Sequence, residues 1–512
     1  MKTGKTEEKM IPVAIAKVVY PGKSLGQAEG KAVFTDEGLP GELVLVEPKK
    51  IKKSYIEGTT REILQASPRR QKPRCQHYRA CSPYQVMDYE DQLAIKKNQL
   101  EEIFSRQLRL DSLPLTIIPS PLPWGYRNRA HFHLLWEDSR PRLAYHQPGS
   151  LQEFVRVEEC FLLPEKVNVL LLRLLSLLET SGLKLIKEVE VRFSFFSKEI
   201  LLVLFIETDG PNHSEKILLS KDFSSSKGAS RIFLDSSRNA SVSSTKPQRL
   251  REEPSLEPLN QESAEIFSAE GPKASPLLPA SSTSRLNNLA HLQALSQLLA
   301  SLPIAGAVAI IRKKGKPEEQ VLFGRPLLWE EVQGRRYGLG PQTFFQVNVV
   351  SLDHLLRDLK AILSLSGQER LADLYCGVGT FGLALASQVA VVYGVELLPA
   401  NIALLKKNLQ ENQISNFIVA PGMASQWAEK ILSQGIDIAI VDPPRRGLER
   451  EVTQALRRYP SRHLLYLSCH PATQARDLGQ LLQVYELQAI RFYDFFPQTP
   501  HIETLSILEA KN

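Results

Sequence analysis

Hydrophobic and polar positions alternate over the first part of the chain. Residues 13–16, 31–34 and 43–46 are apolar runs, and turn residues such as Tyr20-Pro21-Gly22 and Leu39-Pro40-Gly41-Glu42 separate them. Several short strands at this spacing favour a small antiparallel barrel. Basic residues follow at 49–53 and 69–74. A small barrel with basic loops suits an oligonucleotide-binding module, and a purely structural barrel with a charged rim is the alternative.

The middle of the chain changes period twice. Residues 88–110 have helical periodicity, with Leu93, Leu100 and Ile103 apolar and Lys96 and Lys97 charged. Residues 124–160 return to alternation around Trp124-Gly125-Tyr126-Arg127-Asn128-Arg129. Interleaved arginine and aromatic side chains fit RNA contact by stacking and phosphate pairing, although half-buried strands show the same pattern. We therefore expect a β-rich central region.

The last third repeats an apolar strand, a glycine turn and an amphipathic helix. The predicted strands are 371–375, 391–396, 417–420, 436–441 and 464–468. This alternation predicts an α/β fold with a doubly wound parallel sheet and helices on both faces. Ligands of such sheets bind at the carboxyl ends of the strands, which is where the motifs below fall.

Composition and charge narrow the class of protein. Of 512 residues, 43% are hydrophobic and 23% charged, which excludes wholesale disorder, collagen and coiled coil. Residues 224–284 hold 16 Ser and 6 Pro but no Trp, Tyr, His or Cys, so we predict a disordered insertion over about 222–286. The net charge of +7 is a modest indication of a polyanionic partner. Five cysteines without framework spacing, a polar N-terminus and no apolar run of membrane length lead us to expect a cytoplasmic protein without a membrane partner.

A glycine turn follows the first strand of the C-terminal region. Gly377, Gly379 and Gly382 are spaced G-x-G-x-x-G, and Glu396 ends the next strand, placed to bind ribose hydroxyls. These residues alone fit a dinucleotide and S-adenosylmethionine (SAM) equally well. The fourth strand favours SAM, because Asp442-Pro443-Pro444 forms a stiff loop suited to presenting a flipped-out base. A rigid loop with Asp442 as a helix cap is the alternative.

A cysteine and a carboxylate complete the candidate chemistry. Cys469 ends the fifth strand just before a helix that begins at Pro471, whose positive end lowers a thiol pKa from about 8.5. A thiolate can add to C6 of a pyrimidine and so activate C5 toward the methyl sulfonium. Glu503, in a terminal strand, supplies a base to remove the C5 proton. Read singly, Cys469 fits a buried core thiol and Glu503 a solvated strand acid.

Together these motifs resemble the RNA uracil-5-methyltransferase family, and within it the 23S ribosomal RNA branch, which has an N-terminal TRAM barrel and an iron–sulfur cluster. The resemblance covers nearly the whole chain except the insertion. It implies that Gln346, Tyr375, Glu396 and Asp442 contact SAM, that Cys469 is the nucleophile and that Glu503 is the base. It also implies a SAM contact for Thr380, which stands where relatives often have Asn. His470 replaces the Asn usual after the nucleophile.

The resemblance also implies cluster ligands, and here the chain departs from the pattern. The branch has C-x5-C-x2-C and a distant fourth cysteine, to which Cys75, Cys81 and Cys160 correspond, whereas Tyr84 stands at the third position. A [4Fe–4S] cluster normally has four thiolate ligands. The chain therefore binds a cluster with a substitute ligand, binds it weakly or has lost it.

We predict a three-part enzyme: a TRAM-like barrel (1–70), a β-rich central domain with the cluster cysteines (71–340) and a Rossmann-like SAM-dependent methyltransferase domain (341–512). The predicted activity is C5 methylation of a uridine in 23S ribosomal RNA by a monomer. Transfer RNA is the rival substrate. A non-catalytic RNA-binding or RNA-folding protein and a DNA cytosine-5 enzyme are rivals of other kinds.

Overall fold

The computed structural model describes residues 10–109, 112–207, 218–219, 283–312 and 317–511. Most of the insertion predicted at 222–286 therefore lies outside the described residues. Met1–Ser220 and Asn288–Asn512 form one compact unit, which contains all the sites considered below.

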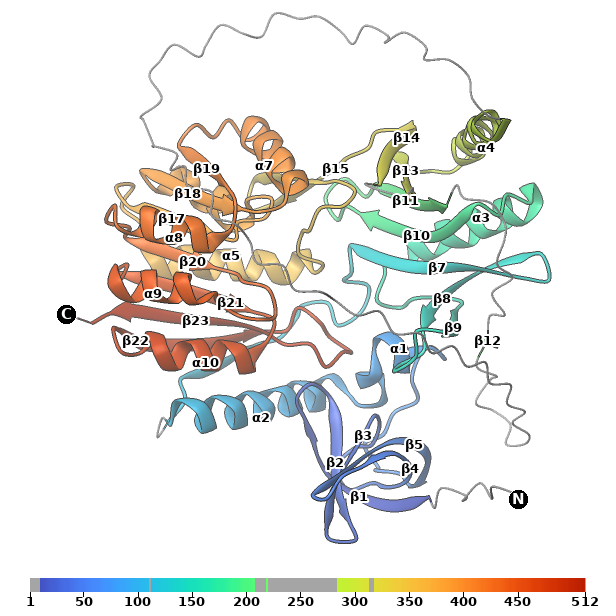
Figure 1. The fold of residues 1–512 in the computed structure, drawn as a ribbon, viewed down its shortest axis with the longest axis horizontal. Coiled ribbons are helices and arrows are strands. Elements are labelled where there is room, and N and C mark those ends of the chain that lie inside the picture. Colours follow the sequence, from blue (N-terminus) through green and yellow to red (C-terminus); the bar gives the residue numbers. More distant parts are fainter. Residues whose placement is uncertain (1–9, 110–111, 208–217, 220–282, 313–316, 512) are drawn as a thin grey trace, which may run out of the picture. The chain divides into compact units, whose positions relative to one another are not determined.

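The N-terminal strands form the predicted barrel (Figure 1). It closes in the order β1-β2-β3-β5-β4, within the predicted range 1–70. The prediction of a purely antiparallel barrel is wrong at one place, because β3 and β5 pair in parallel where the barrel closes. Alternate residues of β1 are buried, and Val13, Val33 and Val44 meet inside. The strands are β1 (Ile11–Val19), β2 (Lys23–Ala28), β3 (Lys31–Thr35), β4 (Leu43–Ile51) and β5 (Tyr55–Gln65).

A long helix follows the barrel. After α1 (Tyr78–Cys81) and the 3-10 turn η1 (Pro83–Val86), α2 spans Tyr89–Leu108, as the periodicity predicts. Asp88 caps it by accepting a hydrogen bond from the Asp91 amide at 2.7 Å. Lys96 does not lie on an exposed charged face, because it is fully buried and pairs with Asp494 at 2.7 Å.

The central region is an eight-stranded sheet in the order β12-β9-β8-β7-β10-β11-β13-β14. Its strands are β7 (Arg129–Glu137), β8 (Arg140–His146), β9 (Glu153–Val157), β10 (Ile186–Phe193), β11 (Ile200–Glu207), β12 (Leu218–Leu219), β13 (Gly306–Arg312) and β14 (Glu318–Gly324). Helices α3 (Glu165–Ser181) and α4 (Thr283–Leu299) pack on one face, where Leu174 and Leu295 meet Phe132 and Leu202. This hydrophobic cluster leaves the opposite face of the sheet for other contacts.

The C-terminal sheet also has eight strands, in the order β19-β18-β17-β20-β21-β23-β22-β6. The parallel strands are β17 (Arg370–Leu374), β18 (Val391–Glu396), β19 (Phe417–Pro421), β20 (Ile438–Val441) and β21 (His463–Ser468), all within two residues of their predicted bounds at either end. The antiparallel strand β23 (Glu503–Ala510) lies between β21 and β22 (Tyr485–Tyr493), and β6 (Leu115–Ile118) pairs with β22.

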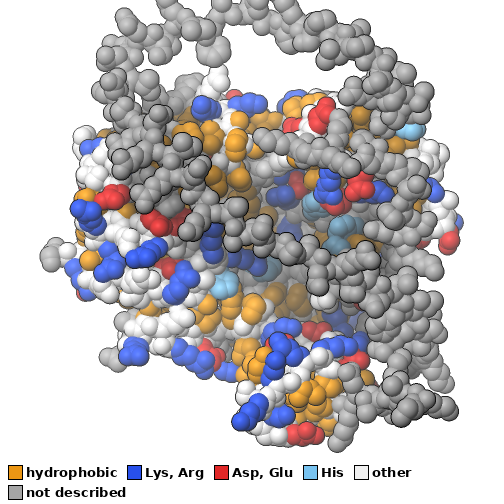
Figure 2. All heavy atoms as spheres, viewed as in Figure 1, with side chains coloured by type: hydrophobic (Ala, Val, Ile, Leu, Met, Phe, Trp, Pro, Cys, Tyr) orange, Lys and Arg blue, Asp and Glu red, His pale blue; other side chains and the backbone are white. Residues whose placement is uncertain are grey.

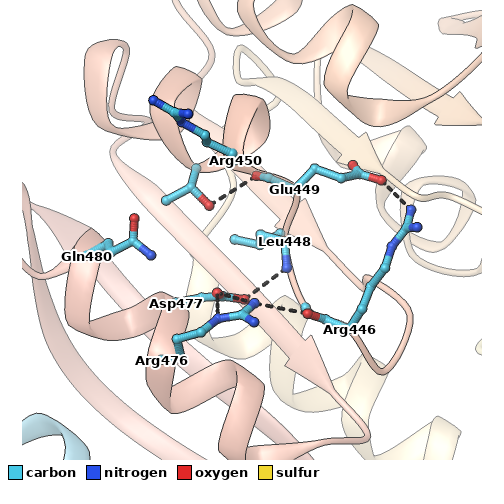
Figure 3. Close-up of a pocket in the computed structure, with 9 residues that line it drawn as sticks. Arg446, Leu448, Glu449, Arg450, Arg476, Asp477 and Gln480 are labelled. Atoms are coloured by element: carbon cyan, nitrogen blue, oxygen red, sulfur yellow. Dashed lines mark hydrogen bonds and ion pairs between the residues drawn. The ribbon is translucent and has the colours of Figure 1, made fainter. Parts of the chain in front are cut away.

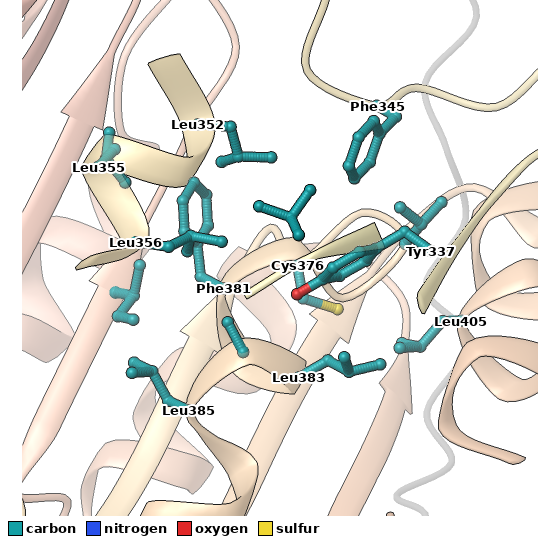
Figure 4. Packing of buried hydrophobic residues seen from close by; sticks show 14 of the residues in the cluster. Tyr337, Phe345, Leu352, Leu355, Leu356, Cys376, Phe381, Leu383, Leu385 and Leu405 are labelled. Atoms are coloured by element: carbon teal, nitrogen blue, oxygen red, sulfur yellow. The ribbon is translucent and has the colours of Figure 1, made fainter. Parts of the chain in front are cut away.

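Helices cover both faces of this sheet, as a doubly wound fold requires. They are α5 (Val349–Leu363), α6 (Thr380–Leu385), α7 (Pro399–Glu411), α8 (Ala424–Leu432), α9 (Arg450–Arg458) and α10 (Pro471–Leu481), with the 3-10 turn η2 (Ala386–Gln388). Leu352 and Leu356 of α5 lie beside Phe381 of α6 on one face (Figure 4). The hairpin β15 (Leu328–Val332) and β16 (Arg335–Leu339) adds Tyr337 to the same cluster.

Helix α2 also contributes to the core of the C-terminal domain. Helix α2 packs on α10, and Leu100 and Phe104 belong to the second core cluster of the C-terminal domain. None of the described helices combines the length and the apolar character of a membrane span.

Candidate active site

Strand register brings the proposed nucleophile and base together. In the antiparallel pair β21–β23, Ser468 lies opposite Thr504. Continuing this register by one residue places Cys469 opposite Glu503, at the carboxyl end of β21. The neighbouring strand β20 ends at Val441, so Asp442 leaves the sheet at the same edge. Three chemically active side chains therefore converge from three adjacent strands.

The surroundings of Cys469 oppose ionisation of its thiol. Helix α10 begins at Pro471 as predicted, but burial and the charges of Glu503 and Asp442 raise the thiol pKa to about 11. Arg445 acts in the opposite direction, through its charge and a hydrogen bond to the thiol. The expected lowering of this pKa by the helix end is therefore outweighed by burial and two carboxylates.

Asp442 and Glu503 form a coupled acidic pair. Burial raises the pKa of Asp442 to about 7. Burial and the charge of Asp442 raise the pKa of Glu503 well above the usual range, and Glu503 is only 4% exposed. A carboxylate with a raised pKa is a stronger base once it has lost its proton, which suits abstraction of a proton from carbon.

The glycine turn forms a cradle beside β17. Gly377 has φ +58°, and a side chain added there would meet open space, whereas one at Gly379 would strike Leu405 and one at Gly382 would strike Phe417. The Gly377 amide donates a hydrogen bond to Glu396 Oε2 at 2.9 Å, and the Leu398 amide donates to Glu396 Oε1 at 2.7 Å. The open space beside the half-buried Gly377 and a carboxylate held at its edge fit a nucleoside with a ribose diol.

The other predicted cofactor residues are Tyr375, Thr380 and Gln346. Tyr375 follows β17 with φ +85° and donates a hydrogen bond to Glu449 at 2.8 Å. Thr380 begins α6 and is buried, and its carbonyl accepts a hydrogen bond from Tyr337. Gln346 is buried just before α5, where its carbonyl accepts a hydrogen bond from Asn128 of the central region.

A pocket of about 490 Å³ lies beside the loop that follows Asp442. Arg446, Arg450 and Arg476 line it, together with Glu449 and Asp477 (Figure 3). Asp477 is buried and accepts hydrogen bonds from the Leu448 amide and the Tyr466 hydroxyl, so it holds the loop against α10. Three arginines at the rim, two of them paired with these acids, give the pocket a positive edge.

Sequence reasoning missed two neighbours of Cys469. Arg445 follows the Asp442-Pro443-Pro444 motif directly, so its place in the loop could have been read from the chain. Tyr20 belongs to the barrel, and its ring lies 5.4 Å from the His470 ring. No local sequence pattern predicts this position of Tyr20, because only the packing of the barrel on the C-terminal domain brings its ring beside His470.

The cysteine region does not provide four thiolates. Cys75, Cys81 and Cys160 lie close enough for their charges to affect one another, and burial raises all three pKa values. Tyr84, at the expected third position, is buried against Val18, Val86 and Met87 at the base of the barrel. Within the part of the chain that the structure describes, no three His, Cys, Asp or Glu side chains are arranged to hold a metal ion. A [4Fe–4S] cluster with four cysteine ligands therefore does not fit these residues.

Hydrogen bonds from neighbouring side chains hold the thiols of Cys75 and Cys81 and the backbone of Cys160. Gln85 donates to the Cys75 sulfur at 3.3 Å, and the Ser82 hydroxyl lies 3.2 Å from the Cys81 sulfur. Asn168 bonds both the amide and the carbonyl of Cys160. These contacts stabilise the region with the protein's own side chains.

Known proteins resemble the chain in sequence. Residues 310–511 match the family model of tRNA (uracil-5-)-methyltransferases. An uncharacterized RNA methyltransferase of Thermosynechococcus vestitus is 29% identical, with 97% of each chain covered. One of Listeria innocua is 26% identical, with 99% of this chain and 98% of the relative covered.

A solved structure resembles the chain in fold. The tRNA (uracil-54, C5)-methyltransferase of Pyrococcus abyssi, in complex with S-adenosyl-L-homocysteine, aligns with a TM-score of 0.65 and 20% identity. The alignment covers 97% of this chain and all of that chain, so the shared fold includes the N-terminal barrel.

Proposed function

This chain belongs to the RNA uracil-5-methyltransferase family, and we propose that it moves a methyl group from SAM to C5 of a uridine in RNA with Cys469 as the nucleophile. The register of β21 and β23 carries the proposal, because it sets Glu503 opposite Cys469 beside Asp442. A core thiol or a solvated strand acid would not require this meeting of buried carboxylates at the sheet edge.

We expect SAM to bind at the glycine cradle. Glu396 would bind the ribose hydroxyls, Tyr375 and Gln346 would flank the adenosine, and Asp442 would face the methionine end. Bound SAM supplies the methyl group and a positive sulfonium. That charge would favour the ionised forms of Cys469 and Asp442, whose present surroundings disfavour them.

In the proposed reaction, Cys469 forms and later breaks a bond to C6 of the uracil, and Glu503 removes the C5 proton. The Cys469 sulfur forms a bond to C6 of the uracil, and the electron pair of the C5–C6 double bond moves toward C5 and the adjoining carbonyl. C5 then takes the methyl group, and the bond between methyl and sulfonium breaks. Glu503 removes the C5 proton, and the bond between sulfur and C6 breaks as the double bond returns.

Part of the central sheet is suited to RNA bases. On the face opposite α3 and α4, Phe205 stacks with His131 at 4.8 Å, and the Arg312 guanidinium lies 5.0 Å from the Phe205 ring centre. His146 stacks with Phe154 at 4.6 Å on the same face. Figure 2 shows histidines gathered beside Lys and Arg in this region. Stacked rings with adjacent cations are the usual means of holding unpaired bases.

We propose 23S ribosomal RNA as the substrate, on the motif resemblance. Transfer RNA is the second candidate. It is favoured by the Pyrococcus abyssi enzyme, a tRNA methyltransferase whose fold includes a barrel, so the barrel does not discriminate between the two RNA classes. Methylation assays on purified ribosomal and transfer RNA, followed by mapping of 5-methyluridine, distinguish the two.

The activity itself is tested with RNA that carries tritium at uridine C5. With SAM present, we expect one tritium released for each methyl group transferred. Release of no tritium by folded protein that binds SAM would exclude C5 of uridine as the target. It would favour the rival view of a non-catalytic RNA-binding protein if methyl transfer were also absent.

A further inference from the structure

The turn between β1 and β2 is the part of the barrel nearest the candidate active site. Val19 pairs with Lys23, so Tyr20, Pro21 and Gly22 form a three-residue turn, closed by a hydrogen bond of 2.7 Å from the Gly22 amide to the Val19 carbonyl. Tyr20 packs against the core cluster of the C-terminal domain rather than inside its own barrel. The turn therefore belongs structurally to both domains.

Tyr20 lies among the reactive groups. Its ring meets the ring of His470, the residue after Cys469, edge to face at 5.4 Å. The charges of Cys469, Glu503 and Arg445 all act on its hydroxyl, and burial raises the Tyr20 pKa to about 12. The hydroxyl is therefore protonated at neutral pH and can serve as a hydrogen-bond donor.

Close packing fixes the turn in this position. A side chain added at Gly22 would come within 2.5 Å of Pro500, and the Gly22 φ of +98° itself favours glycine. Gln99 of α2 donates a hydrogen bond to the Val18 carbonyl at 3.1 Å, just before the turn. Lys17 pairs with Glu102 of the same helix at 2.8 Å.

Tyr84 packs beside the same turn of the barrel. Its hydroxyl is 3.7 Å from the position of a Gly22 side chain and 3.4 Å from the Gln99 amide nitrogen. Tyr84 stands where the family pattern has its third cysteine. It therefore helps to hold the barrel turn beside the candidate active site.

We propose that Tyr20 is a substrate-contacting residue of the active site: its ring closes one side of the uracil pocket, and its hydroxyl donates a hydrogen bond to a carbonyl oxygen of the target base. This inference rests on the proposed function. Addition of the Cys469 sulfur to C6 shifts negative charge toward a base carbonyl oxygen. A neutral donor fixed beside that oxygen stabilises the charge as it develops. The barrel would then complete the catalytic site in addition to binding RNA.

The test compares Tyr20→Phe with the wild-type protein and with Tyr55→Phe. Tyr55 lies in the same barrel, where its ring packs against Phe34, so its variant controls for loss of a barrel hydroxyl. We expect Tyr20→Phe to lower kcat for tritium release by about tenfold or more. We expect its SAM affinity, RNA affinity and melting temperature to stay at wild-type values, and Tyr55→Phe to keep the wild-type kcat.

A second variant moves the turn without removing the hydroxyl. Gly22→Ala should push the turn away from Pro500 and lower kcat, with circular dichroism showing that the barrel stays folded. A wild-type kcat for Tyr20→Phe, whatever its RNA affinity, overturns the inference and leaves the proposed function standing. If wild-type protein with either RNA class releases no tritium, the proposed function fails first.

Discussion

At the scale of single residues, the active site is a cluster of groups whose neighbours disfavour their charged forms. Burial and the charges of Glu503 and Asp442 raise the pKa of Cys469 to about 11, and burial raises the pKa of Asp442 to about 7. A free enzyme with a protonated thiol is protected from unwanted reactions of a thiolate. On the proposed function, we expect this arrangement to become reactive when the SAM sulfonium occupies the cradle and RNA displaces water.

Replacement of Glu503 should separate methyl transfer from product release. Glu503→Gln keeps the size of the side chain but removes the base. The methylated base should then remain bonded to Cys469, because the C5 proton that must leave first has no acceptor. We expect a protein–RNA complex that survives denaturing electrophoresis and carries label from SAM. Turnover of Glu503→Gln at the wild-type rate, without this complex, would assign the base to another group.

The pH dependence of the rate follows from the same carboxylates. The pKa of Asp442 is raised to about 7 and that of Glu503 well above its usual range, so the ionised fraction of each increases with pH. We expect kcat/KM for RNA to increase as pH rises above about 6, because the base must be ionised to accept the C5 proton. The measurement is tritium release at constant ionic strength, with circular dichroism as a check on folding. A rate that falls over this range would contradict a carboxylate base.

At the scale of elements, local sequence patterns predicted the positions of the strands better than the pairing between strands. The parallel strands β17, β18 and β21 were predicted because each is a continuous apolar run that ends in a turn motif. Strand β6 was not predicted, because its four residues are recognisable only through their pairing with β22. Pairing between distant segments is set by tertiary packing, which a local pattern does not contain.

The candidate site divides in the same way. Cys469, Glu503 and Asp442 were predicted because each stands in a motif at a strand end. Tyr20 could not be predicted, since its contact with His470 depends on how the barrel packs on the C-terminal domain. The missing thiolate at Tyr84 was visible in the sequence, but only the structure shows where that side chain packs.

The buried pair between α2 and the segment after β22 is a second feature that periodicity missed. Lys96 and Asp494 are both fully buried, and Lys96 also donates to the Phe496 carbonyl at 3.0 Å. Lys96→Met should leave an unpaired buried carboxylate and lower the free energy of unfolding by about 3–5 kcal/mol. Chemical denaturation measures this loss.

The matched control for this prediction replaces both partners. The double variant Lys96→Met with Asp494→Leu removes the uncompensated charge and should recover much of the lost stability. A single variant as stable as the wild type would mean that α2 is not fastened to the C-terminal domain by this pair.

At the scale of the whole molecule, we propose that three regions supply parts of one function. The barrel would contribute Tyr20, the C-terminal sheet the reactive groups, and the central sheet the stacked rings. Asn128 connects the last two, because its side chain bonds the Gln346 carbonyl and its amide bonds the Val347 carbonyl. RNA that binds to the central sheet would therefore affect the segment around Gln346, which is proposed to bind SAM.

The stacked face of the central sheet predicts a specific effect on RNA binding. Phe205→Ala removes the ring between His131 and Arg312 and should weaken RNA binding by roughly 1–3 kcal/mol, the usual contribution of one stacked base. Filter binding at fixed salt measures the change. Val321→Ala, at an exposed position of β14, is the control. Equal RNA affinity of both variants would remove this face from the interface.

The central claim is that Cys469 forms a covalent bond to C6 of a uridine in RNA. The most direct measurement uses RNA in which 5-fluorouridine replaces uridine, because fluorine at C5 cannot be removed as a proton and the covalent intermediate persists. After incubation with SAM, digestion and mass spectrometry should find a methylated fluorouridine nucleotide attached to Cys469, and Cys469→Ala should yield none. A nucleotide attached to another residue, or undiminished methylation of ordinary uridine by Cys469→Ala, would contradict the account.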